Sequence, residues 1–280
     1  MAVRRSSTAA RRRLGTELRR LRDAAGMTIE QVAESLECSV SKISRIETGQ
    51  VGATARDVRD MLEIYGVTGK QQEPLIKVAK EARERGWWHR YGNVAISAHL
   101  SFEAAASTFR IYEAALVPGL LQTAEYAAAV IRALHPDMPS NQLKQALDLR
   151  LERQRVLQQP YAPTLWAILD ESIVRRPVGG KQVMRDQLIH LASAAEDPNV
   201  TLQVLAFSAA EHAGMDGAFT ILGFPDPADP DIVYRDHATS ALLLEGAEEL
   251  RRYALLFDHL RATALKPIDS IAFLKDLIDE

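Results

Sequence analysis

The stretch from Thr28 to Gln50, TIEQVAESLECSVSKISRIETGQ, constrains the fold more than any other part of the chain. Thr28 has Gln31 three residues after it, which is the pattern of a capping box at a helix start. Ser39 is an N-cap candidate for a second helix, and Gly49 stands where glycine commonly ends one. The stretch therefore predicts two short helices joined by a tight turn.

Apolar residues fall on one face of each predicted helix, at Val32, Ala33 and Leu36 and then at Val40, Ile43 and Ile46. The small side chain of Ala33 lets the two backbones approach, which is typical of a helix-turn-helix. In such a motif the second helix enters the major groove of DNA. The alternative is an ordinary pair of helices inside a helical core.

Three further helices are predicted around this pair. One has an apolar stripe at Leu14, Leu18, Leu21 and Ala25 and leaves arginines off the stripe, exposed, at positions 19, 20 and 22. Another begins at the capping pair Thr54 and Asp57 and ends near Gly66, and the last spans residues 71–85. Five helices make a compact N-terminal domain.

The charge of the chain is divided unevenly. Residues 1–90 hold 18 Lys and Arg against 12 Asp and Glu, a net of +6, whereas the remainder holds 16 against 25, a net of −9. A basic segment suits a DNA reader, and an acidic one does not. Cys38 is the single cysteine, so no intrachain disulfide can form, and a cytoplasmic location is expected.

After residue 100 the pattern changes to mixed helices and strands. Helices are predicted over 101–112, 120–134, 141–158, 183–196, 245–264 and 270–278. Strands are predicted over 164–170, 200–206, 218–224, 231–235 and 241–244. The strands at 164–170 and 200–206, with a helix between them, predict one parallel crossover. We expect an α+β domain with a mixed sheet of about five strands.

The domain boundaries follow from these elements. We expect a flexible basic arm at 1–13, a helix-turn-helix domain at 14–85, an aromatic linker at 86–100 and an α+β domain at 101–280. The arm either contacts DNA or is a solvated tail. The linker contains Trp87 and Trp88, which we interpret as an interdomain anchor, with a ligand-stacking site as the alternative.

The helix pair resembles the XRE (lambda-repressor-like, Cro/C1) helix-turn-helix family. The resemblance includes the small residue Ala33, the apolar Ile43 and Ile46, and the ending Glu47-Thr48-Gly49. That family often has glycine where this chain has Glu37, so we expect a strained positive φ angle at this glutamate.

The chain as a whole, from about residue 10 to 275, resembles the actinobacterial WhiJ-like regulators. The segments EARERGWWHRYG, YEAALVPGLLQTAEYA, RLERQRVL, LDESIVRRPVGG, VMRDQLIHL and HAGMDGAFTILGF carry this resemblance. It implies a transcriptional regulator with a C-terminal domain of uncharacterised function, often encoded beside a small partner protein.

The predicted DNA-reading residues lie mostly on the second helix of the pair. Arg45 can form a bidentate pair with guanine, and its alternative is a salt bridge to Glu47 or Glu34. Val40 can pack on a thymine methyl, whereas Lys42 and Thr48 suit phosphate contacts. The full predicted set is Thr28, Ser39, Val40, Ser41, Lys42, Ser44, Arg45 and Thr48.

No pattern in the sequence predicts an enzyme, a metal site or a cofactor. Gly179-Gly180-Lys181 lacks the earlier glycine of a phosphate loop, and the histidines have no metal-ligand spacing. Weaker candidates have structural alternatives. They are Asp170 and Glu171 as acids, Arg150, Arg153 and Arg155 as an anion site, and His212 and Asp216 in a loop over a pocket.

The sequence therefore predicts a DNA-binding transcriptional regulator acting as a homodimer on an inverted repeat. Its C-terminal domain is expected to bind a partner protein or ligand, or to dimerise. The alternative is an antitoxin-like protein that neutralises a small neighbour-encoded protein and regulates its own operon.

Overall fold

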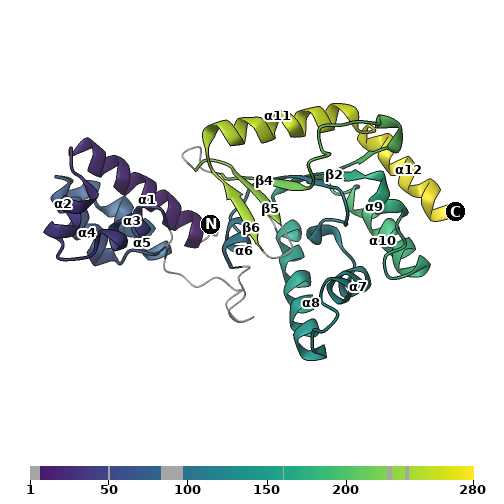
Figure 1. Cartoon of the computed structure of the whole chain (residues 1–280), viewed down its shortest axis with the longest axis horizontal. Coiled ribbons are helices and arrows are strands. Elements are labelled where there is room, and N and C mark those ends of the chain that lie inside the picture. Colours follow the sequence, from purple (N-terminus) through teal and green to yellow (C-terminus); the bar gives the residue numbers. More distant parts are fainter. Residues whose placement is uncertain (1–6, 50, 83–96, 160, 226–228, 237–239) are drawn as a thin grey trace. The chain divides into compact units, whose positions relative to one another are not determined.

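The computed structural model describes residues 7–49, 51–82, 97–159, 161–225, 229–236 and 240–280 (Figure 1). It divides into two compact units, Met1–Ala105 and Ala106–Glu280. The first is helical and the second combines helices with a sheet, so the predicted pairing of an α and an α+β region is confirmed.

In the N-terminal unit, the described residues form the five predicted helices and one more. They are α1 (Ser7–Ala24), α2 (Ile29–Ser35), α3 (Val40–Glu47), α4 (Ala55–Ile64), α5 (Glu73–Glu81) and α6 (Ser97–Glu103). Their apolar stripes meet in one core, to which Leu18, Val58 and Met61 contribute fully buried side chains. Burial of this shared stripe, rather than helix propensity, stabilises helices as short as α2 and α3.

The predicted helix caps are present. The Thr28 hydroxyl accepts a hydrogen bond from the Gln31 N–H (3.3 Å), and the Gln31 side chain accepts one from the Thr28 N–H (2.8 Å). Ser39 caps α3 through the Lys42 N–H at 3.2 Å. Thr54 and Asp57 form a second capping box at the start of α4. These bonds satisfy N–H groups that have no partner within the helix.

The predicted flexible arm is too long. Helix α1 begins at Ser7, so residues 7–13 are helical. Arg11 and Arg12, expected in the arm, make contacts within the unit. The Arg11 Nε donates to the Ala82 carbonyl at 3.1 Å, and the Arg12 guanidinium lies 5.2 Å from the centre of the Phe102 ring. These contacts tie the first turns of α1 to its neighbours. The predicted anchor residues Trp87 and Trp88 lie outside the described residues.

The C-terminal unit is built on a six-stranded sheet in the order β3-β2-β1-β4-β5-β6, one strand more than predicted. Its strands are β1 (Thr108–Glu113), β2 (Thr164–Asp170), β3 (Val200–Leu205), β4 (Phe219–Gly223), β5 (Ile232–Asp236) and β6 (Ala241–Leu244). Strands β1, β2 and β3 are parallel, as predicted for the last two, and each remaining pair is antiparallel.

The extra strand is β1, so the prediction of a helix over 101–112 is wrong. Phe102, Ala105, Phe109 and Tyr112 have helical spacing, but the helix ends at Glu103. From Thr108 the chain pairs with β2 on one side and β4 on the other. A central strand gains hydrogen bonds and burial on both sides, and these tertiary contacts outweigh the local pattern.

The helices cover both faces of this sheet (Figure 1). They are α7 (Ala124–Leu134), α8 (Ser140–Gln154), α9 (Glu171–Arg175), α10 (Lys181–Ala194), α11 (Ala247–Thr263) and α12 (Pro267–Asp279). Phe257 and Leu260 of α11 pack on one face against Ile168 and Val233. Among the described residues, no helix is both long and apolar enough to cross a membrane.

Candidate nucleic-acid interface

The turn between α2 and α3 sets the angle of the second helix. The Cys38 N–H donates to the Ala33 carbonyl at 2.9 Å, which closes the turn directly after α2. Glu37 has a φ of 49°, the left-handed conformation expected at this position. A side chain with a Cβ is strained there, which is why glycine is the usual residue in such turns.

Helix α3 has one buried face and one exposed face. Ile43, Ile46 and Glu47 point into the unit. Val40, Ser41 and Arg45 are exposed, and 43% of the surface of Val40 is accessible to solvent. Because 3.6 residues make one turn, Ser41 and Arg45 lie one above the other on the outer face. The predicted reading residues of α3 are thus on the side that faces away from the core.

Arg45 is placed to reach a ligand outside the protein. One predicted alternative was a salt bridge to Glu47, but that carboxylate is buried and paired with Arg22. Among the residues that the structure describes, Arg45 has no ion-pair partner at all, Glu34 included. The N–H groups of its guanidinium are therefore available to an acceptor outside the protein.

Lys42, predicted as a phosphate contact, is turned toward α4. Its ammonium lies 2.8 Å from the Asp57 carboxylate. Burial alone would raise the pKa of Asp57, but hydrogen bonds from Lys42 and Thr54 lower it to about 2. A phosphate must compete with this ion pair for Lys42, so the phosphate contact stays a prediction. The observed role of Lys42 is to join α3 to the first turn of α4.

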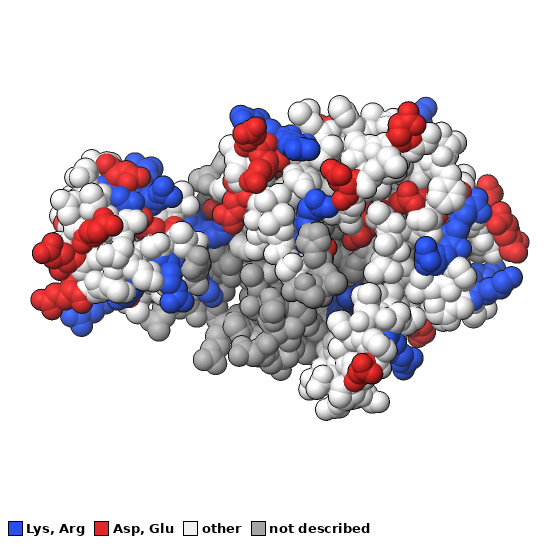
Figure 2. Space-filling view, in the orientation of Figure 1, with Lys and Arg blue, Asp and Glu red and all other residues white. Residues whose placement is uncertain are grey.

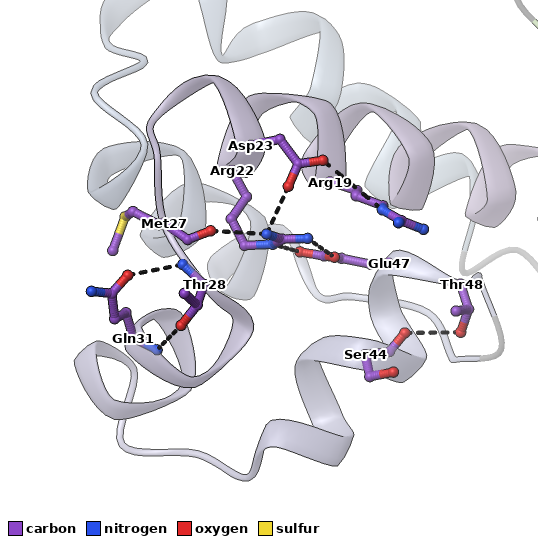
Figure 3. Close-up of polar contacts among 9 residues, drawn as sticks. All are labelled: Arg19, Arg22, Asp23, Met27, Thr28, Gln31, Ser44, Glu47 and Thr48. Atoms are coloured by element: carbon purple, nitrogen blue, oxygen red, sulfur yellow. Dashed lines mark hydrogen bonds and ion pairs between the residues drawn. The ribbon is translucent and has the colours of Figure 1, made fainter.

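A buried ion pair between Arg22 and Glu47 fixes the other end of α3 to α1 (Figure 3). The Arg22 Nε and one Nη donate to the two oxygens of Glu47 at 2.8 and 3.0 Å. The other Nη donates to the Met27 carbonyl at 2.9 Å and to Asp23 at 2.8 Å. The prediction that Arg22 is exposed is wrong, because it is only 7% exposed.

Gly15 is a second contact that sequence reasoning missed. A Cβ at this position would lie 2.5 Å from the Glu47 carbonyl oxygen, so α1 and the end of α3 are in close approach. The signal was present in the sequence as a glycine inside a helix, which is costly unless close packing requires it. Together, Gly15 and Arg22 fix the position along α1 at which α3 packs.

Three other predicted residues, Thr28, Ser39 and Thr48, carry hydroxyl groups at the ends of α2 and α3. Figure 3 shows Thr28 at the start of α2, away from Ser44 on α3 and from Thr48 directly after it. The Thr48 hydroxyl donates to the Ser44 carbonyl at 2.9 Å and stays exposed. Thr28 and Ser39 are also exposed while they cap their helices. All three hydroxyls remain reachable from outside the unit.

Charge on the visible face is mixed. In Figure 2 basic and acidic side chains lie side by side over the helices α1 to α5. Several are paired locally, for example Arg20 with Glu17 at 2.7 Å. Such exposed ion pairs contribute little to stability. The net positive charge of this region therefore does not form one uniform patch on the side shown.

Two family models match the chain. Residues 13–75 match one described as a helix-turn-helix domain. Residues 96–276, more than half of the chain, match one described as a domain of unknown function, DUF5753. The chain belongs to the DUF5753 family. No curated protein and no solved structure matches it. The helix-turn-helix match covers the α2–α3 pair and supports DNA binding by this unit.

Within the DUF5753 region, the acidic candidates have structural roles. The Asp170 side chain accepts a hydrogen bond from the Ser172 N–H and caps α9. Glu171 is buried, pairs with Arg175 and accepts from the Phe207 N–H at 2.7 Å. The carboxylate of Asp170 lies 4.0 Å from the His212 Nε2.

The arginine candidates of the DUF5753 region are spread over several partners. Arg150 donates to the Gln122 side chain at 2.7 Å. Arg155 pairs with Glu152 at 2.8 Å. Arg153 lies near Gly119. The anion site therefore stays a prediction. Asp216 accepts a hydrogen bond from Arg235 through its backbone carbonyl.

Proposed function

We propose that the chain is a sequence-specific transcriptional regulator that binds DNA through the outer face of α3. The observation that carries the proposal is Arg45, exposed on that face while Glu47, its predicted alternative partner, is buried in a pair with Arg22. An arginine of this kind can pair with guanine, a contact worth about 1–3 kcal/mol of discrimination against other bases. Ser41 and Val40 on the same face add weaker contacts.

The proposal includes a homodimer on an inverted repeat. One helix-turn-helix module buries only about 600–1,000 Å² on DNA, which favours two modules acting together. Half-sites would then be separated by about 34 Å or a multiple of it. The resemblance to WhiJ-like regulators supports a C-terminal domain that dimerises or binds a partner protein or ligand. No catalytic reaction is assigned to it.

Selection of bound fragments from the parent genome tests the proposal. The intact chain is expected to enrich one short inverted repeat, whose half-site spacing reports the geometry of the dimer. Non-specific phosphate contacts would give a different result. Unrelated fragments would be enriched in proportion to their length, and binding would fall steeply as the salt concentration rises. That result would contradict sequence-specific regulation. A single half-site without a repeat would refute the dimer.

A further inference from the structure

The two edge strands of the sheet, β3 and β6, differ in how their outer backbone groups are used. At β3, the segment that leads into α12 lies along the edge. The Leu265 N–H donates to the Val204 carbonyl at 2.9 Å, and the Val204 N–H donates to the Ser270 hydroxyl, also at 2.9 Å. This cover closes the β3 edge to a further strand at Val204.

The outer edge of β6 is open. Its inner edge pairs with β5, from Ala241 opposite Asp236 to Leu244 opposite Val233. Among the described residues, no hydrogen bond joins the backbone of β6 to any segment other than β5. In an antiparallel edge strand, alternate residues direct both the N–H and the C=O outward. Two of the four residues of β6 therefore offer backbone groups to a further strand.

The side chains of β6 do not protect this edge either. Edge strands usually carry lysine, proline or a bulge that prevents pairing. β6, with the sequence Ala-Leu-Leu-Leu, contains no charge and no proline. Leu244 packs against the core beneath α11, whereas Leu242, two residues away on the same face, is 43% exposed. The open edge thus carries an apolar side chain that solvent reaches.

A second copy of the chain is the partner that this geometry fits. Two antiparallel β6 strands are related by a two-fold axis perpendicular to the sheet, which keeps α11 on the same face in both copies. Residues opposite each other then point to the same face, so Leu242 can stand opposite Leu242 of the partner subunit. In that register Ala241 stands opposite the partner's Leu243 and Ser240 opposite the partner's Leu244, and no charge meets a like charge.

The two edges together limit the assembly to two copies. Because β3 is covered and β6 is open, a copy can add only through β6, so pairing closes at a dimer and does not grow into a fibre. The contact is small, because a strand of four residues is about 14 Å long. It buries much less than the roughly 1,600 Å² of a standard interface. The dimer is therefore expected to be weak and to depend on protein concentration.

We propose that two copies of the chain pair through β6, with Leu242 of each copy at the two-fold axis, to form one continuous sheet. The inference deepens the homodimer of the proposed function, because an inverted repeat also places its two occupants about a two-fold axis. It rests on the proposed function only in that respect, and its test contains no DNA. Failure of the pairing and failure of DNA binding are therefore separate results.

Sedimentation equilibrium of the full chain, from about 1 µM to about 500 µM, is the first test. Monomer is expected at the lowest concentration and mostly dimer at the highest, for a dissociation constant of about 100 µM. Amide hydrogen exchange at both ends of this range should show new protection in Ala241–Leu244 at high concentration and no change at Val204. A chain that stays monomeric, or that dimerises without protection of β6, overturns the proposal.

A charge exchange at Leu242 tests the predicted register. Leu242→Lys and Leu242→Glu each place like charges at the axis, so each variant should dimerise at least about tenfold more weakly than the unmodified chain. A mixture of the two variants should dimerise again, because a lysine then stands opposite a glutamate. Ile268→Lys replaces an exposed isoleucine of α12, which packs at the β3 edge, and is the matched control with no change expected.

Three results with these variants would contradict the proposal. They are dimerisation of Leu242→Lys as strong as that of the unmodified chain, a mixture of the two Leu242 variants that stays monomeric, and equal weakening by Ile268→Lys. Leu242 and Ile268 are exposed, so the variants are expected to fold. The exchange measurement on the unmodified chain needs no variant, so it decides the question even where a substitution disturbs folding.

Discussion

Removal of the Glu47 side chain from the buried pair is expected to lower the local stability of α3. Glu47→Ala deletes two hydrogen bonds and leaves the Arg22 guanidinium buried, with the Met27 carbonyl and the exposed Asp23 as its remaining partners. Breaking a buried pair on one side costs about 3–5 kcal/mol. Because Asp23 still offers a charge, we expect about 3 kcal/mol, the lower end of that range.

Amide hydrogen exchange of the full chain measures this loss directly at α3. A decrease of about 3 kcal/mol in the free energy of opening corresponds to exchange about a hundredfold faster. Glu17→Ala removes an exposed pair with Arg20 and is the matched control, with an expected change of about twofold at most. The double variant Arg22→Met with Glu47→Leu should recover most of the protection, because apolar side chains replace both charges.

Equal exchange at α3 in Glu47→Ala and Glu17→Ala would refute this reasoning. It would mean that α3 is held by its apolar face alone, through Ile43 and Ile46. A double variant as unstable as Glu47→Ala would show instead that the pair has a geometric role that apolar packing cannot replace.

Two further predictions concern the region where α3 begins. The pKa of Asp57 is lowered to about 2, so its contribution of about 2 kcal/mol is present above pH 4 and is lost as pH falls toward 2. Amide hydrogen exchange in α4, measured at decreasing pH, should show this loss in the intact chain and not in Asp57→Asn. The same dependence on pH in both proteins would contradict the prediction. Glu37→Gly relieves the positive φ and should raise stability by about 0.5–1 kcal/mol in thermal unfolding, whereas a decrease would show that the turn is unstrained.

The helix-turn-helix could be predicted almost completely, because its signals are local. Thr28, Ser39 and Gly49 mark helix ends through bonds to residues three or four positions away. The positive φ at Glu37 was expected from the family resemblance, because that family often has glycine at this position. Such features depend on a few neighbouring residues and need no knowledge of the rest of the fold.

Contacts between distant segments could not be predicted. Arg22 looked exposed because it lies off the apolar stripe of α1, and only the position of Glu47 makes its burial favourable. The helical spacing of Phe109 and Tyr112 concealed β1, whose pairing partners are more than fifty residues away. Without β1, the order of the strands in the sheet could not be recognised.

Binding of Arg45→Ala to the selected operator and to unrelated DNA of equal length tests the central claim most directly. If Arg45 reads a base, the variant loses about 1–3 kcal/mol on the operator, or roughly five- to 150-fold, and changes little on unrelated DNA. An equal loss on both would mean that Arg45 contacts phosphate only, and the outer face of α3 would not be the source of sequence specificity.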